Sequence, residues 1–304
     1  MGFYFECDES TPAGLRRILV EQLIRLDQDL AGTEKDPKKA IHEVRKRCKH
    51  VRAVFRLIRP HAESFYQREN ATFRDMAQGL SPFRDADARM EAFDALIKHT
   101  GHKGAKLSSL RALLSDDARS EHPADEFRTR MAAIAGETQD AQERFKAMDL
   151  PEESGFDLIE PGIRRSYKRG RKAMTAAYEA AAEESAFHEW RKRVKDLGYQ
   201  LQLLRELWPP VLKGLHKEID ELGSLLGQEH DLAVLKNAVL ADTTPPAPEE
   251  DLQAFQEFVD KRTGEFRAQA LSIGQRIYAE GSKDFTQRLR LYWHAWREEG
   301  AVTT

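Results

Sequence analysis

The chain has 304 residues, of which 33% are charged and 9% aromatic, and its formal net charge is −3. This net charge excludes a generally basic nucleic-acid binder, so an anion site must come from local segregation of charge. Cys7 and Cys48 are far apart and give neither a disulfide framework nor zinc spacing. The first residues lack the pattern of a signal peptide, and no apolar run is long enough to span a membrane. We therefore expect a cytoplasmic protein without membrane contact.

Apolar residues recur with a period near 3.6 along almost the whole chain, and alternating strand patterns are absent. The helices predicted between Gly, Pro and Ser clusters cover residues 12–31, 37–59, 61–80, 82–98, 103–116, 124–147, 157–184, 185–207, 209–227, 229–241, 248–280 and 283–298. A connection over residues 148–162 separates an N-terminal bundle, 1–150, from a C-terminal bundle, 151–304. The sequence therefore predicts an all-α protein made of two helical bundles.

One stretch of sequence occurs twice. Residues 40–49 read AIHEVRKRCK and residues 186–195 read AFHEWRKRVK, at an offset of 146. At the same offset, LSPFRD at residues 80–85 falls opposite LGQEHD at residues 226–231. A period near half the chain length favours two similar bundles over a solenoid of many short units. We expect a pseudo-twofold relation that brings equivalent faces toward a shared basic groove.

Each copy predicts a row of cations on a helix, next to an apolar stripe. In the first copy the stripe contains Ile41, Val44, Cys48, Val51, Phe55 and Ile58, and the row contains His42, Arg45, Lys49, Arg52 and Arg56, flanked by Lys46. In the second copy the stripe contains Phe187, Trp190, Val194, Leu197, Leu201 and Leu204, and the row contains His188, Arg191 and Lys195, flanked by Lys192. Residues 44–59 contain seven cations and no carboxylate, so they repel one another instead of forming the ion pairs of an ordinary solvated face. A bound polyanion would relieve that repulsion.

Other cations extend the candidate anion site. A third basic run contains Arg164, Arg165, Lys168, Arg169, Arg171 and Lys172, and its counterpart in the first half is limited to Arg16 and Arg17. The repeat also pairs Arg84 with His230. We include all of these residues except Arg169 among the candidates.

The two aligned histidines could donate a hydrogen bond to phosphate, or add charge near their usual pKa of about 6.5. Binding would then strengthen as the pH falls through about 6.5. Asp85, Asp87, His230 and Asp231 are residue types that could hold a metal ion. Since cations surround both aligned histidines, they would repel a divalent metal. We therefore predict neither a metal site nor another cofactor.

The doubled His-x-x-Arg-Lys-x-x-Lys helix, at residues 42–49 and 188–195, resembles the signature of the CHAD domain, the conserved histidine α-helical domain. GIRRSYKRGRKAM at residues 162–174 is similar to that family's Gly-x-Arg-Arg-x-Tyr helix. The stretches that end at Asp85 and Leu232 are similar to its Leu-Gly-x-x-(Arg/His)-Asp-Leu elements. The resemblance covers nearly the whole chain and implies two four-helix-type bundles around a basic central groove or pore that binds inorganic polyphosphate.

The second copy departs from the first at two positions, because Gly198 and Gln202 stand where the first copy has Arg52 and Arg56. In addition, Ser81-Pro82 replaces the glycine of the first Leu-Gly element. These departures predict a groove that is shorter on one side.

The favoured function is binding of inorganic polyphosphate without catalysis, with polyphosphate and its granules as partners. Single-stranded RNA binding is one alternative, but the cationic faces carry few aromatic side chains for base stacking. A metal-dependent phosphohydrolase is another, but the rows contain no carboxylate pair at ligand spacing. We therefore expect neither a nucleic-acid partner nor an enzymatic activity.

Overall fold

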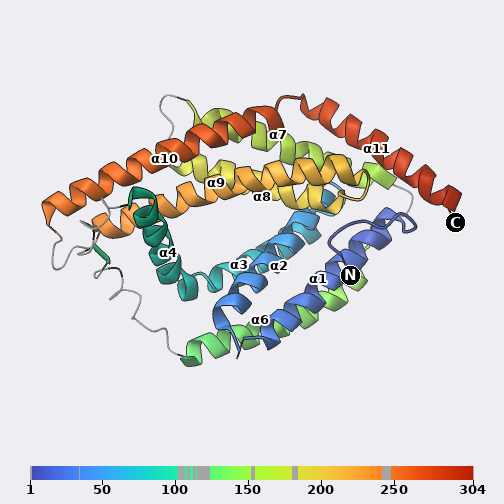
Figure 1. The fold of residues 1–304 in the computed structure, drawn as a ribbon. Coiled ribbons are helices and arrows are strands. Elements are labelled where there is room, and N and C mark those ends of the chain that lie inside the picture. The colour runs from blue at the N-terminus through green and yellow to red at the C-terminus, as the bar shows by residue number, and fades with distance from the viewer. Residues whose placement is uncertain are drawn as a thin grey trace.

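The computed structural model describes residues 2–33, 35–101, 107, 110–111, 114, 124–151, 155–179, 184–241 and 248–303. Within these ranges the chain forms helices and no strand (Figure 1), which confirms the all-α prediction. The helix expected over 103–116 falls largely outside the described residues. None of the helices in the described part is long and apolar enough to cross a membrane.

The bounds of the helices are α1 (Thr11–Ala31), α2 (Pro37–Ile58), α3 (Glu63–Gly79), α4 (Pro82–Thr100), α6 (Ala124–Lys146), the 3-10 helix η2 (Gly155–Leu158), α7 (Glu160–Ala177), α8 (Glu184–Leu203), α9 (Pro209–Ala241), α10 (Glu249–Ile277) and α11 (Ser282–Thr303).

Helix α2, which carries the first cationic row, begins at a strong local signal. The Asp36 side chain accepts a hydrogen bond from the backbone N–H of Lys39 at 3.0 Å, and Pro37 occupies the first helical turn. A capping carboxylate followed by proline is a favoured helix start because the first N–H groups have no partner within the helix. This capping signal fixes the start of α2 and therefore the place where its cationic row begins.

The prediction of two helices over 209–227 and 229–241 is wrong, since α9 runs without interruption through Gly227 and Gln228. A glycine inside a helix costs about 1 kcal/mol relative to alanine, and burial of the preceding Leu225 and Leu226 offsets that cost. The matching region of the first half is interrupted. There α3 ends at Gly79 and α4 begins at Pro82, which cannot continue a preceding helix.

Helices α7 to α10 lie together as one group, and α1, α2, α3 and α6 form a second group beside it (Figure 1). Helix α4 leaves the second group and packs on α9 and α10, while α2 contacts both α7 and α8. Helix α8 begins 147 residues after α2, and α9 begins 146 residues after α3. These bounds agree with the offset of the sequence repeat. The twofold relation and the division into two bundles stay predictions.

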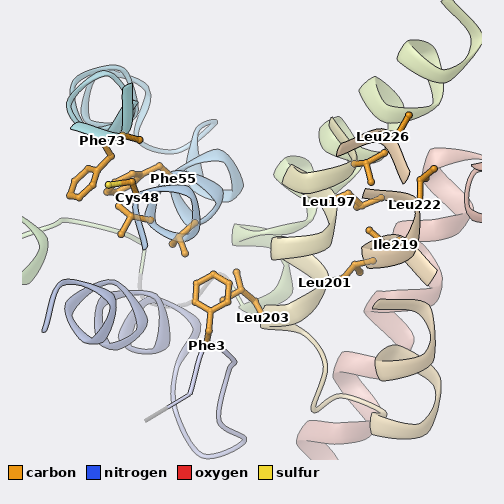
Figure 2. Close-up of a cluster of buried hydrophobic side chains, with 14 of the residues drawn as sticks. Phe3, Cys48, Phe55, Phe73, Leu197, Leu201, Leu203, Ile219, Leu222 and Leu226 are labelled. Carbon is orange, nitrogen blue, oxygen red and sulfur yellow. The ribbon is translucent and has the colours of Figure 1, made fainter. Parts of the chain in front are cut away.

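Both predicted apolar stripes are buried, each member at 5% exposure or less, and both belong to one continuous core. Phe55, Cys48 and Phe73 fill the first group, whereas Leu197 and Leu201 of α8 pack against α9 (Figure 2). Because the stripes are buried, each cationic row has to emerge at the side of its helix.

One close contact between the two groups lies where α7 meets α2. A Cβ added at Gly162 would lie 2.4 Å from the Cα and the carbonyl oxygen of Leu57. Real side chains do not approach backbone atoms this closely, so only glycine allows this contact. The contact holds the start of α7 against the C-terminal end of α2.

Candidate functional site

The row on α2 runs beside its buried stripe. His42 and Lys49 are exposed, while Arg45, Arg52 and Arg56 are half-buried. The Arg45 guanidinium donates hydrogen bonds to the carbonyl oxygen of Ala77 at 2.7 Å and to the hydroxyl of Ser81 at 2.5 Å. Arg45 is therefore anchored at the junction of α3 and α4, whereas His42 and Lys49 reach solvent.

The row on α8 lies against α9, and each successive turn of α8 faces a successive turn of α9. The rings of His188 and His230 stack with centroids 4.3 Å apart. One turn further, a Cβ added at Gly227 would lie 3.6 Å from Nε of Arg191. Two turns further, a Cβ added at Gly223 would lie 2.9 Å from Nζ of Lys195. The glycines of α9 thus leave room for the cations of α8.

The two rows meet at Lys49. Desolvation by the surrounding protein and then repulsion from neighbouring cations together lower its pKa to about 8. These neighbours are Arg45 of α2, Arg191 and Lys195 of α8, and Arg84 of α4. We call these five residues the central cluster. The Lys49 side chain is thus exposed in part, while the protein around it desolvates its ammonium group.

The flanking lysines repeat one arrangement in both halves. Lys46 lies 3.4 Å from Glu43, and Lys192 lies 3.7 Å from Glu189, each pair separated by three positions on its helix. Both lysines are more than 40% exposed, so these ion pairs are weak and screened. The two lysines therefore border the rows without being committed to a carboxylate.

The histidines are less basic than the sequence suggested. Desolvation, then repulsion from His230, Lys192 and Arg191, lowers the pKa of His188 to about 4. Desolvation and the same two cations lower the pKa of His230 to about 4. Desolvation and Arg84 also lower the pKa of His42. Without a bound anion, these histidines are therefore protonated at a lower pH than the value near 6.5 that the sequence led us to expect.

The α2 row ends in a cavity of about 220 Å³, which we call the arginine pocket. Its lining residues come from α2, α3, α7 and α8: Arg52, Arg56, Arg59, Tyr66, Asn70, Arg74, Arg165, Ser166, Arg169, Arg193 and Asp196. Asn70 accepts a hydrogen bond from Nε of Arg52 at 3.1 Å. Asp196 lies 3.0 Å from Arg56 and 3.2 Å from Arg193. The pocket thus joins both halves of the sequence.

The basic run on α7 divides between two environments. Arg165 reaches the arginine pocket. By contrast, Arg164 forms an ion pair with Glu160, and Arg171 donates to the carbonyl oxygen of Glu280 at 3.3 Å. Lys168 and Lys172 are exposed elsewhere on the helix. The structure therefore connects only part of this run with the other candidates.

The arginines of α1 are engaged in contacts away from the other candidates. Arg16 donates to the carbonyl oxygen of Met148 at 3.0 Å. Arg17 lies 2.6 Å from Glu9 and 3.2 Å from Glu21, and these carboxylates raise its pKa. Neither residue lines the arginine pocket or perturbs Lys49.

Sequence reasoning missed four arginines of the pocket. Arg169 and Arg193 stand inside the basic stretches, and their positions on the helices could have identified them. Arg59 ends the cation-rich stretch 44–59 but lies outside the row on that helix, and Arg74 carried no signal, because the place of both depends on how α3 packs on α2.

The candidate metal ligands are not gathered. Asp87 pairs with Lys38 at 2.8 Å, His230 stacks on His188, and the side chain of Asp85 lies outside the described residues. In the part of the chain that the structure describes, no group of three His, Cys, Asp or Glu side chains is placed to hold a metal ion.

Comparisons with known proteins place this geometry in context. The family model described as the CHAD domain matches residues 17–240. PptA from Streptomyces chartreusis is structurally similar with a TM-score of 0.62 and 16% identity, over 90% of this chain and 100% of that one. The CHAD domain from the plant Ricinus communis is similar with a TM-score of 0.54 and 16% identity, over 97% of this chain and 95% of that one. At these identities the solved structures show the fold alone. The search of curated proteins found no match.

Proposed function

The chain belongs to the CHAD domain family, and from this premise we propose that it binds inorganic polyphosphate through the cations of α2 and α8. The observation that carries the proposal is the position of Lys49 among Arg45, Arg84, Arg191 and Lys195. Five cations close enough to perturb one another destabilise the empty site, and a polyanion removes that penalty.

A phosphate polymer suits these donors. Arginine offers a planar fork and lysine a point charge, and both bind phosphate oxygens without reading any sequence. Binding also releases counterions condensed on a linear polyanion, which adds a salt-dependent driving force. The two bundles expected from the sequence would then form one site together. The protein would act in the cytoplasm, and its partners would be polyphosphate and polyphosphate granules.

The placement of aromatic residues favours polyphosphate over single-stranded RNA. Phe55, Phe187 and Trp190 lie on the same helices as the cations, but each is at most 4% exposed. Buried rings cannot stack on nucleobases, and such stacking supplies much of the affinity for single strands. The proposed mechanism uses only charge and hydrogen bonding, so it requires no catalytic step.

A charge-matched pair of variants tests the proposal. We expect Lys49→Gln with Lys195→Gln to weaken binding of long-chain polyphosphate about tenfold or more and to make the salt dependence shallower. The control is Lys217→Gln with Lys261→Gln, which removes two exposed charges elsewhere. Fluorescence anisotropy with labelled polyphosphate measures both, and helical circular dichroism checks folding.

Three results would contradict the proposal. Equal affinity of the Lys49/Lys195 variant and the control would remove the central cluster from the site. Displacement of polyphosphate by RNA at equal phosphate concentration would overturn the choice of polymer. Release of phosphate from polyphosphate in the presence of Mg²⁺ or Mn²⁺ would show catalysis.

A further inference from the structure

The arginine pocket differs from the rows in its geometry. Along α2 the cations follow one another on one side of a helix, whereas in the pocket they come from four helices around one cavity. Arg52 and Arg56 belong to both features, so the row on α2 leads into the pocket. A polymer lying along α2 therefore reaches a place where donors surround it.

The size of the pocket restricts what it accepts. Its volume of about 220 Å³ is below the range of about 300–1,000 Å³ typical of sites for drug-sized molecules. Neutral donors from Tyr66, Asn70 and Ser166 accompany the guanidinium groups. The pocket thus suits a small, oxygen-rich anion.

The charge of the pocket remains positive after its ion pairs are counted. Seven arginines line it, and Asp196 is the one carboxylate among the described lining residues. Three further carboxylates pair with lining arginines from outside the cavity: Glu63 with Arg59, Asp75 with Arg74 and Glu189 with Arg169 and Arg193. Four carboxylates against seven guanidiniums leave an excess of positive charge. In agreement, desolvation and then repulsion from Arg56 lower the pKa of Arg52 to about 10.

The two kinds of phosphate in a linear polyphosphate differ in charge. An internal phosphate carries about one negative charge, whereas a terminal phosphoryl group has a second ionisation with a pKa of about 6 and three free oxygens. A terminal group therefore gains more from donors that converge from several sides, and an internal group is satisfied by donors along a line.

We propose that the arginine pocket binds the terminal phosphoryl group of polyphosphate and that the following phosphates lie along α2. This inference rests on the proposed function and adds recognition of the chain end to it. It makes the pocket an end-specific site, with Arg165 and Arg169 of α7 closing around the terminus opposite Arg52 and Arg56.

End-capped polyphosphate tests the inference. Converting both terminal phosphates to alkyl phosphoramidates removes one charge at each end and leaves the internal phosphates unchanged. We expect capping of short chains to weaken binding to the wild type about threefold to tenfold, as the loss of one charged contact would. Capping should not change the affinity of the double variant Arg165→Gln with Arg169→Gln. It should weaken binding to the control, Lys217→Gln with Lys261→Gln, as much as binding to the wild type.

A second variant guards against a folding defect. Arg74 is more than half exposed, so Arg74→Gln should fold normally and show a reduced effect of capping. Equal binding of capped and uncapped chains by the wild type would overturn end recognition while leaving polymer binding intact. An equal effect of capping on the wild type and on the Arg165/Arg169 variant would overturn the role of the pocket. Failure of the wild type to bind either chain would instead refute the proposed function.

Discussion

Arg56 of α2 and Asp196 of α8 form an ion pair of 3.0 Å that joins the two halves of the sequence. Asp196 is only 9% exposed and also lies 3.2 Å from Arg193, so one carboxylate holds two guanidiniums at the wall of the arginine pocket. An entering phosphate would compete with this carboxylate for the same donors.

We expect Asp196→Asn to bind polyphosphate more tightly and to be less stable without it. The change keeps the shape of the side chain but removes the charge opposite Arg56, which should cost about 1–3 kcal/mol of unfolding free energy. Urea unfolding with and without polyphosphate measures both effects, because a ligand stabilises the state that it binds. An unchanged affinity would mean that Asp196 does not compete with the ligand.

The contact of Gly162 with Leu57 predicts a stability defect. Gly162→Ala should lower the free energy of unfolding by about 1–3 kcal/mol, because the added methyl group has to push α7 away from the backbone of α2. Gly136→Ala is the matched control, since its Cβ would meet no atom within 4 Å and alanine favours a helix. Chemical denaturation compares the two variants, and equal stability would refute the close packing of α7 on α2.

The glycines of α9 allow a test of binding without loss of fold. Gly223→Ala should push the end of Lys195 aside and weaken polyphosphate binding, whereas Gly227→Ala leaves an ordinary contact of 3.6 Å with Arg191. Neither change should destabilise the protein, because a flexible lysine end moves easily and alanine gains about 1 kcal/mol over glycine in a helix. Similar affinities of the two variants would show that the position of Lys195 is unimportant.

The lowered pKa of Lys49 predicts proton uptake on binding at alkaline pH. In the empty protein this lysine loses its proton as the pH rises through about 8, and a bound polyanion favours the charged form. At pH 9 binding should therefore take up about one proton, and affinity should fall as the pH rises from 8 to 10. Calorimetry in buffers of different ionisation enthalpy measures the uptake. Lys49→Arg should reduce it, and equal uptake in both proteins would contradict the assignment.

The stacked pair His188 and His230 predicts a second pH dependence, on the acid side. Since both pKa values are about 4 in the empty protein, a bound polyanion would raise them, and affinity should rise as the pH falls from about 6 toward 4. The unliganded protein should lose stability over the same range, because the unfolded chain binds protons near pH 6.5 and the folded one does not. His188→Gln with His230→Gln should flatten both profiles. Profiles identical to those of the wild type would remove the pair from the site.

The local pattern predicted much of the helix geometry on which the candidate site depends. The three- and four-residue spacing of apolar residues on α2 and α8 placed both stripes in the core and both rows beside them. Prediction failed at α9, where the break expected after Gly227 does not exist, because packing of the neighbouring leucines outweighs the cost of a glycine. It also failed for the acidity of the histidines, which depends on desolvation by helices far away in the sequence.

The order of residues by itself determined the helices, their buried sides and the identity of the cations, since these follow from the spacing of neighbouring side chains. Tertiary structure alone decided which cations meet. Packing of α2 against α7, α8 and α3 brought Arg59, Arg74, Arg169 and Arg193 around one cavity and left Arg16, Arg17 and Arg164 in contacts outside it. The physical reason is that helical periodicity specifies the direction of a side chain relative to its own axis, whereas its partners depend on contacts between helices, many of them more than a hundred residues apart.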